Sequence, residues 1–225
     1  MTDVSICALV AAFDEEATVR QVVRGTVPHV SRVVVVDDGS TDRTAQIARD
    51  AGATVLLHER NLGKGCAIRT GLSYILEQPH THVLFLDGDL QHDPTEIPKL
   101  VERSAKGTAD FVLGEREFSR EAMPPARFYS NVIGSRILSS LIGVEIADSQ
   151  SGFRLIRTDL LRKVLLTATG YEIETEMLIK LTRVGARVER VGVHRLRYDG
   201  ARSKMRPVRD TFRTCMLALR YRFLA

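Results

Sequence analysis

Two groups of aspartate residues follow apolar segments of the sequence, and their carboxylates could act together on a charged ligand. The stretch VLFLDGDLQHDP contains Asp87, Asp89 and Asp93, and the stretch VVVVDDGS contains Asp37 and Asp38. Carboxylates that are brought together repel one another and cost stability unless a cation or a hydrogen-bonding ligand neutralises them. If the fold brings both groups to one place, the pattern therefore indicates a binding site rather than ordinary surface charge.

Valine- and leucine-rich segments alternate with helical patterns in the first half of the chain. Strands are predicted at about 5–13, 32–37, 54–58, 82–87 and 109–114, with helices at about 15–25, 41–51, 65–78 and 94–106. This order predicts an α/β fold with a Rossmann-like, mostly parallel sheet flanked by helices. Ligands of such sheets bind outside the carboxyl ends of the strands, where both aspartate groups fall.

The pattern changes after the fifth predicted strand. Met123-Pro124-Pro125 interrupts the chain, and an amphipathic stretch follows from Arg127 to Ile142. A helix is predicted near 172–184 and a strand near 187–193, and no repeat or low-complexity tract is present. We therefore expect a single domain with two sub-regions.

Composition excludes several classes of protein. The chain has 225 residues, of which 44% are hydrophobic and 27% are charged, so it can bury a substantial core. Its three cysteines are odd in number and widely spaced, which argues against a disulfide framework or a structural zinc site. Neither a signal peptide nor an apolar segment of membrane-spanning length is apparent. A cytoplasmic protein is predicted, with attachment to the cytoplasmic face of a membrane as the alternative.

Basic residues concentrate at the end of the chain. Between Arg195 and Ala225 there are nine Lys or Arg residues and two Asp. Nucleic acid is an unfavourable partner, because no aromatic stacking platform accompanies these charges. The segment from Pro207 predicts a helix with one apolar face, formed by Val208, Phe212, Cys215, Met216, Leu219 and Phe223. We expect that face to pack on the core, with a membrane interface as the alternative.

The sequence around the Asp-x-Asp pair and the first strand does not match an EF-hand, a dinucleotide fingerprint or a P-loop. An EF-hand starting at Asp87 would need glycine and an acid where His92 and Pro98 stand. The first strand is followed by AAFDEEATV, which has no glycine, so a dinucleotide fingerprint is absent from the sequence. Gly63-Lys64-Gly65 lacks the Ser or Thr of a P-loop, although it could bring a cation and backbone amides to a phosphate. Asp-x-Asp offers oxygen ligands to Mg²⁺ or Mn²⁺ and leaves positions for a diphosphate.

Five segments, taken in order, resemble the family 2 glycosyltransferases with the GT-A fold. They are VAAFDEEATV, VVVVDDGSTDRT, NLGKGCAIRTG, LFLDGDLQHDP and DSQSGFR, and the resemblance extends to YDGARSKM. The likeness is greatest to the branch of dolichyl-phosphate mannosyltransferase and polyprenyl-phosphate glycosyltransferases. It implies one GT-A domain, with a nucleotide-sugar half at about 1–115, an acceptor half at about 116–206 and an amphipathic helix at about 207–225.

The resemblance also implies an activity. This is the metal-dependent, inverting transfer of a hexose from a GDP- or UDP-sugar to a polyprenyl phosphate. Mg²⁺ or Mn²⁺ would be held by Asp87, Asp89 and Gln91. The remaining donor contacts would come from Phe13, Glu16, Asp38, Lys64, Arg202 and Lys204.

The acceptor side follows from the same resemblance. Arg116 would bind the acceptor phosphate with help from Arg127 and Ser130, and Asp148 would face the reaction centre. The residues implied to be catalytic are therefore Asp89, Asp148 and Arg116.

The sequence leaves the acceptor and the class of reaction open. A lipid phosphate is ionised near pH 7 and needs no strong base, whereas a saccharide or small-molecule hydroxyl does; candidate bases are Asp148, Glu174 and Glu176. A nucleotidyltransferase would normally carry a glycine-rich, lysine-containing loop after the first strand, which this chain lacks. A non-catalytic binding protein would not need the paired acids.

Asp93 has a separate interpretation. It stands just before Pro94 and an apolar helical pattern, so it is predicted to cap the next helix. Glu96, three residues further on, would complete a capping box.

Overall fold

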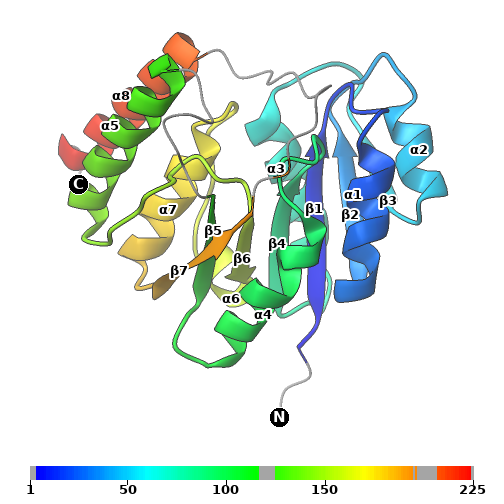
Figure 1. The fold of residues 1–225 in the computed structure, drawn as a ribbon, viewed down its shortest axis with the longest axis horizontal. Helices are drawn as coiled ribbons and strands as arrows, with labels where there is room; N and C mark the ends of the chain where they lie inside the picture. Colours follow the sequence, from blue (N-terminus) through cyan, green and yellow to red (C-terminus); the bar gives the residue numbers. More distant parts are fainter. Residues whose placement is uncertain (1–3, 117–124, 195, 197–206, 224–225) are drawn as a thin grey trace.

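The protein is built around one seven-stranded sheet. The computed structural model describes residues 4–116, 125–194, 196 and 207–223. The strands are β1 (Ile6–Ala12), β2 (Arg32–Asp37), β3 (Thr54–Leu57), β4 (His82–Asp87), β5 (Phe111–Arg116), β6 (Arg154–Arg157) and β7 (Val188–Val193). Their order in the sheet is β3-β2-β1-β4-β6-β5-β7 (Figure 1). Only β6 runs antiparallel to its neighbours in this sheet, so the predicted mostly parallel sheet is confirmed.

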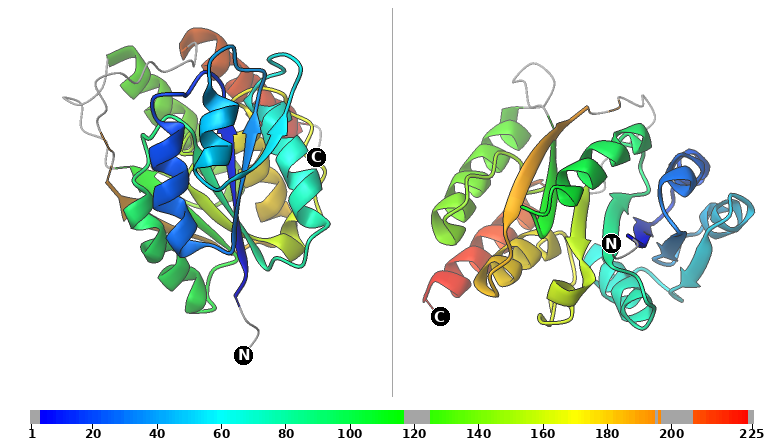
Figure 2. Two further views of the ribbon diagram at one scale, coloured as in Figure 1. Left: turned by 90° about the vertical axis from the view of Figure 1, so that its right-hand side faces the viewer. Right: turned by 90° about the horizontal axis from the view of Figure 1, so that it is seen from below.

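Helices cover both faces of the sheet. The α-helices are α1 (Val19–Thr26), α2 (Thr44–Asp50), α3 (Lys64–Leu76), α4 (Ile97–Ala105), α5 (Pro125–Ile142), α6 (Thr158–Leu161), α7 (Ile173–Arg183) and α8 (Pro207–Phe223), and the short 3₁₀ helices are η1 (Val27–His29) and η2 (Pro94–Glu96). Helices α1 and α4 pack on one face, and α3 and α7 pack on the other (Figure 2). The result is a three-layer sandwich of the predicted kind.

The central strand β1 shows why the sequence adopts this arrangement. Its alternate residues Cys7 and Leu9 join the core beneath α3, while Ala8 and Val10 join the core beneath α1. All four are at most 1% exposed. A strand buried on both faces needs apolar residues at every position, which accounts for the uninterrupted run ICALVAA.

Two local features differ from the prediction. Strand β6, which inserts between β4 and β5, was not predicted, because its four residues RLIR carry two arginines and give no alternating pattern. Asp93 does cap the next helix, since its carboxylate accepts a hydrogen bond of 2.9 Å from the Thr95 amide. The predicted capping box is wrong, because the Glu96 carboxylate pairs with Lys99 instead.

Helix α8 lies alongside α5 and α7 (Figure 1). It buries a stripe that contains Asp210, Thr214 and Ala218, spaced four residues apart. Met216 and Leu219, which belong to the predicted apolar face, are 50% and 44% exposed. The expectation that this face packs on the core is therefore wrong for these two residues; side chains of its other members lie outside the described part of the chain.

Candidate active site

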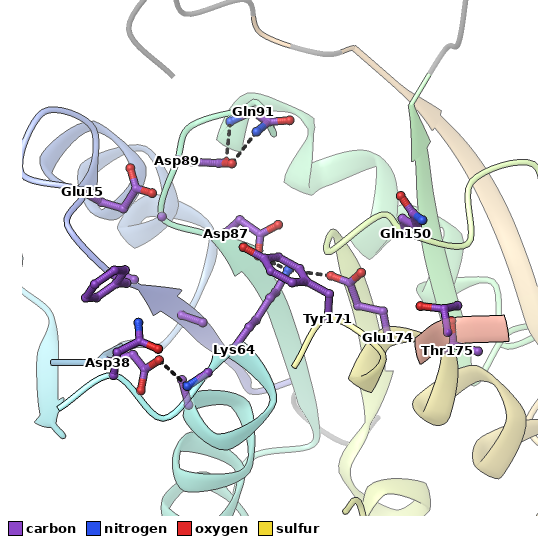
Figure 3. Close-up of a pocket in the computed structure, with 18 of the residues that line it drawn as sticks. Glu15, Asp38, Lys64, Asp87, Asp89, Gln91, Gln150, Tyr171, Glu174 and Thr175 are labelled. Atoms are coloured by element: carbon purple, nitrogen blue, oxygen red, sulfur yellow. Dashed lines mark hydrogen bonds and ion pairs between the residues drawn. The ribbon is translucent and has the colours of Figure 1, made fainter. Parts of the chain in front are cut away.

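A cavity of about 380 Å³ opens at the carboxyl ends of the parallel strands (Figure 3). The loops after β1 and β4, the first turn of α3, the end of β5 and the first turn of α7 line it. The predicted site residues that line it are Phe13, Asp38, Lys64, Asp87, Asp89, Gln91 and Arg116, together with the candidate base Glu174. The topology therefore brings both aspartate groups to one place, as the sequence analysis expected.

Lys64 is the central cation of the cavity wall. Its ammonium lies 2.6 Å from Asp87 Oδ1 and 2.6 Å from Glu174 Oε1, and its side chain is 13% exposed. The Tyr171 ring lies beside it, with 5.6 Å from Nζ to the ring centroid. Burial alone would lower the pKa of Lys64, but the two carboxylates raise it above its ordinary value. Lys64 therefore stays charged and joins α3, β4 and α7.

Asp87 occupies a tight position at the end of β4. Burial opposes ionisation of Asp87, but the charge of Lys64 outweighs it and holds the pKa of this carboxyl below its usual range. Gly152 packs against the other side of the carboxylate: a Cβ atom there would lie 2.6 Å from Asp87 Oδ2. The glycine of the SGFR motif therefore leaves room for this aspartate.

Asp89 and Gln91 form a second acidic position two residues along the chain. The Gln91 backbone and side-chain nitrogens both donate to the Asp89 carboxylate. Leu90 between them has φ +57°, a left-handed conformation that is uncommon for a non-glycine residue and costs about 1–3 kcal/mol. This backbone turns Asp89 and Gln91 toward the cavity (Figure 3).

The acidic edge of the cavity, formed by Asp87 and Asp89, suits a hard divalent cation. Burial, together with the negative charge of Asp87, raises the pKa of Asp89. A bound cation would relieve the repulsion between the two carboxylates and favour ionised Asp89. Among the described residues, no three His, Cys, Asp or Glu side chains gather into a metal cage. Carboxylates that leave coordination positions for phosphate oxygens are typical of Mg²⁺ and Mn²⁺ sites.

Asp38 lines the cavity and also holds the segment that leads into α3. Its carboxylate accepts hydrogen bonds from the backbone amides of Leu62 and Gly63, at 2.9 and 2.8 Å, and contacts His58 Nδ1 at 2.6 Å. The Gly65 amide donates to the carbonyl of Thr169. These three amides are already engaged within the protein, and Lys64, the first residue of α3, lines the cavity.

Arg116, at the end of β5, forms an ion pair with Asp148. The guanidinium donates from Nε and Nη2 to the two oxygens of Asp148, at 2.6 and 3.2 Å. Asp148 is fully buried and does not line the cavity, whereas Arg116 does. Asp148 therefore aims the arginine instead of facing the cavity itself.

The SGFR motif is a structural support behind the cavity. Arg154 is fully buried and donates to the backbone carbonyls of Ser149, Ser151 and Glu174. Ser151 donates to the carbonyl of Gly114. The motif thus ties the segment after Asp148 to β5 and to the first turn of α7.

Several predicted residues lie elsewhere. Glu16 is outside the cavity and pairs with Arg43, while its neighbour Glu15 lines the cavity. Glu176 is also outside, where it accepts hydrogen bonds from Thr167 and Ala168. Arg202 and Lys204 are outside the described residues, as are the side chains of Arg127 and Ser130.

Sequence reasoning also missed cavity residues. Tyr171 and Gln150 line the cavity, but they are uncharged and the sequence analysis selected charged residues. The only signal for Tyr171 was its position two residues before the helix that carries Glu174.

The comparisons with known proteins identify the class. The glycosyl transferase family 2 model matches residues 7–165, so the chain belongs to this family and is a glycosyltransferase. Glycosyltransferase AglJ of Haloferax volcanii is 31% identical over 212 residues, covering 92% of this chain and 68% of the relative. Undecaprenyl-phosphate mannosyltransferase of Micrococcus luteus is 32% identical, covering 81% of this chain and 80% of the relative.

Solved structures agree with this family assignment. Glucosyl-3-phosphoglycerate synthase from Mycobacterium tuberculosis, in complex with Mg²⁺ and UDP, matches with a TM-score of 0.76 and 25% identity. The match covers 98% of this chain and 79% of that chain. A complex of the same enzyme with Mn²⁺ and UDP-glucose has a TM-score of 0.73. The expected GT-A fold and the expected family are thereby confirmed.

The contact between Gly152 and Asp87 gives a first prediction. Gly152→Ala should force the Asp87 carboxylate away from Lys64 and lower glycosyl transfer roughly 10- to 100-fold, a loss typical of disturbed supporting residues. Gly192→Ala is the matched control, because a Cβ atom there meets no atom within 4 Å. Release of nucleoside diphosphate from the donor measures the rate, and equal rates for the two variants would contradict this role of Gly152.

Proposed function

We propose that this protein transfers a hexose from a GDP- or UDP-sugar to a polyprenyl phosphate, in a metal-dependent, inverting reaction. Residues about 1–115 would bind the donor and the following region the acceptor. The relatives include a protein named as an undecaprenyl-phosphate mannosyltransferase. Another, from Methanococcus voltae, is named UDP-N-acetylglucosamine–dolichyl-phosphate N-acetylglucosaminyltransferase and is 31% identical, covering 80% of each chain.

The observation that carries the acceptor class is the engagement of all three candidate bases. Asp148 is bound to Arg116, Glu174 to Lys64, and Glu176 to Lys180 and the backbone of Thr167. An ion-paired carboxylate must leave its cation before it can take a hydroxyl proton, and this holds for Glu174 even though burial raises the pKa of its carboxyl. A phosphate acceptor needs no such base, because its oxygen is already ionised near pH 7.

The donor side follows from the acidic edge. Asp87, Asp89 and Gln91 would hold Mg²⁺ or Mn²⁺, which supplies charge neutralisation of the departing diphosphate when bound. Phe13, Glu15 and Asp38 also line the cavity, and the nucleoside would lie against them. Lys64 adds a fixed positive charge beside Asp87.

The acceptor side is proposed to centre on Arg116. Its guanidinium reaches the cavity while Asp148 holds it at two points, an arrangement that presents a preoriented cation to a phosphate. Inversion requires the phosphate oxygen to attack the anomeric carbon from the side opposite to the diphosphate. Arg116 and the acidic edge both line the cavity, so an acceptor phosphate bound by Arg116 would lie in the same space as the donor.

The donor and acceptor classes can be tested together. The purified protein, with Mn²⁺ or Mg²⁺, should release nucleoside diphosphate from a GDP- or UDP-hexose faster when polyprenyl phosphate is added. Asp89→Asn should lower that rate about 100-fold or more, because a cation ligand beside the leaving group is lost. Asp93→Asn, which alters only a helix cap in the same motif, should leave it nearly unchanged.

Other outcomes of this assay contradict the proposal in different ways. Stimulation by saccharide hydroxyls alone would indicate the other acceptor class. Pyrophosphate release would indicate a nucleotidyltransferase. Full activity of the Asp89→Asn variant would contradict the metal role.

We further propose that α8 meets an anionic membrane surface on the cytoplasmic side. Its described exposed side chains include Met216 and Leu219 flanked by Arg213 and Arg220, while its one acidic residue, Asp210, is buried. Apolar side chains beside arginines suit the boundary between headgroups and acyl chains of anionic lipids. None of the described helices is long and apolar enough to cross a membrane.

Substitution tests this surface better than truncation, because α8 also covers α5 and α7. The double variant Met216→Glu, Leu219→Glu should bind vesicles of anionic lipid several-fold more weakly than the wild type in a sedimentation assay. Leu165→Glu is the control, since Leu165 is 77% exposed and lies outside α8. Equal retention of the two variants would contradict a membrane role for α8.

A further inference from the structure

Glu174 contacts Lys64, a group that links the donor side of the cavity to α7. Its side chain is 5% exposed, and its Oε1 atom lies 2.6 Å from the Lys64 ammonium. Lys64 is bound on its other side by Asp87, a proposed cation ligand. Glu174 lines the cavity, but its carboxylate is bound to the lysine, an arrangement that differs from the free general base considered from the sequence.

The surroundings of Glu174 fix it in this position. Arg154 donates a hydrogen bond of 2.6 Å to its backbone carbonyl. The carboxylate therefore projects from a held backbone, in the first turn of α7.

Lys64 needs a second anchor once a ligand binds. A divalent cation at Asp87 would repel the ammonium, since like charges only a few ångströms apart interact strongly in a partly buried site. The side chain of lysine has four rotatable carbons and a point charge, so it is easily displaced. Glu174 supplies an attraction that the cation does not compete for directly.

We propose that Glu174 is a positioning residue that holds the Lys64 ammonium in the cavity wall when a divalent cation and a nucleoside diphosphate occupy the site. This inference rests on the proposed function for the class of ligand. Lys64 contacts the diphosphate, and Glu174 acts on the ligand only through Lys64.

The proposal predicts non-additive losses. Glu174→Gln should weaken binding of GDP or UDP, in the presence of Mn²⁺, roughly 10- to 100-fold by isothermal titration calorimetry. Lys64→Met should weaken it at least as much. The double variant should bind no more weakly than Lys64→Met alone, because Glu174 has no further effect once Lys64 is absent.

A matched control separates this role from general damage to a buried ion pair. Glu96 is also buried and paired with a lysine, Lys99, but lies outside the cavity. Glu96→Gln should leave nucleotide affinity unchanged. Glu174→Asp, which keeps the charge on a shorter side chain, should show a smaller loss than Glu174→Gln, and thermal unfolding reports whether each variant is folded.

Two results would overturn the proposal. One is wild-type nucleotide affinity in Glu174→Gln together with a turnover loss of about 100- to 10,000-fold, the signature of a general base. The other is losses that multiply in the double variant. If the wild type binds neither nucleotide, the proposed function fails, but crystal structures with Mn²⁺ still decide the role of Glu174. The Lys64 ammonium should move away from Asp87 in Glu174→Gln and stay beside it in the wild type. An unmoved Lys64 in the variant would overturn the proposed role of Glu174.

Discussion

The buried ammonium of Lys64 is the interaction on which the rest of the site depends. Removing a charge from water is costly, and this one is stable there because Asp87 and Glu174 each lie 2.6 Å from it. The three residues come from α3, β4 and α7, so one ion cluster fixes the relative positions of both halves of the cavity. Removing either carboxylate would leave a buried cation without full charge compensation. The neighbouring residues must therefore hold both carboxylates in place.

Those surroundings explain motifs whose role was unclear from the sequence. Gly152 leaves space for Asp87, and Arg154 holds the backbone of Glu174. Gly63 precedes Lys64 with φ +99°, and a side chain there would meet the carbonyl of Thr169 at 2.5 Å. These motif residues thus support the charged groups of the Lys64 cluster and take no part in the chemistry themselves.

The sequence was sufficient to predict six of the seven strands and the acidic edge, because parallel strands such as β4 show buried apolar runs that end in polar residues. It could not predict the pairing of Lys64 with Glu174, since 110 residues separate them and only the fold brings α3 and α7 to the same face of the sheet. It also misjudged the outer face of α8, where Met216 is exposed. Periodicity identifies an apolar face but not whether protein or another medium covers it.

The central claim is that the edge formed by Asp87 and Asp89 binds a divalent cation together with a diphosphate. Titration of Mn²⁺ into the protein, followed by electron paramagnetic resonance of the free ion, tests it without any acceptor. We predict weak binding by the protein alone, at least tenfold tighter binding when GDP or UDP is present, and loss of that gain in Asp89→Asn. Mn²⁺ affinity that neither nucleotide nor this substitution changes would contradict the account.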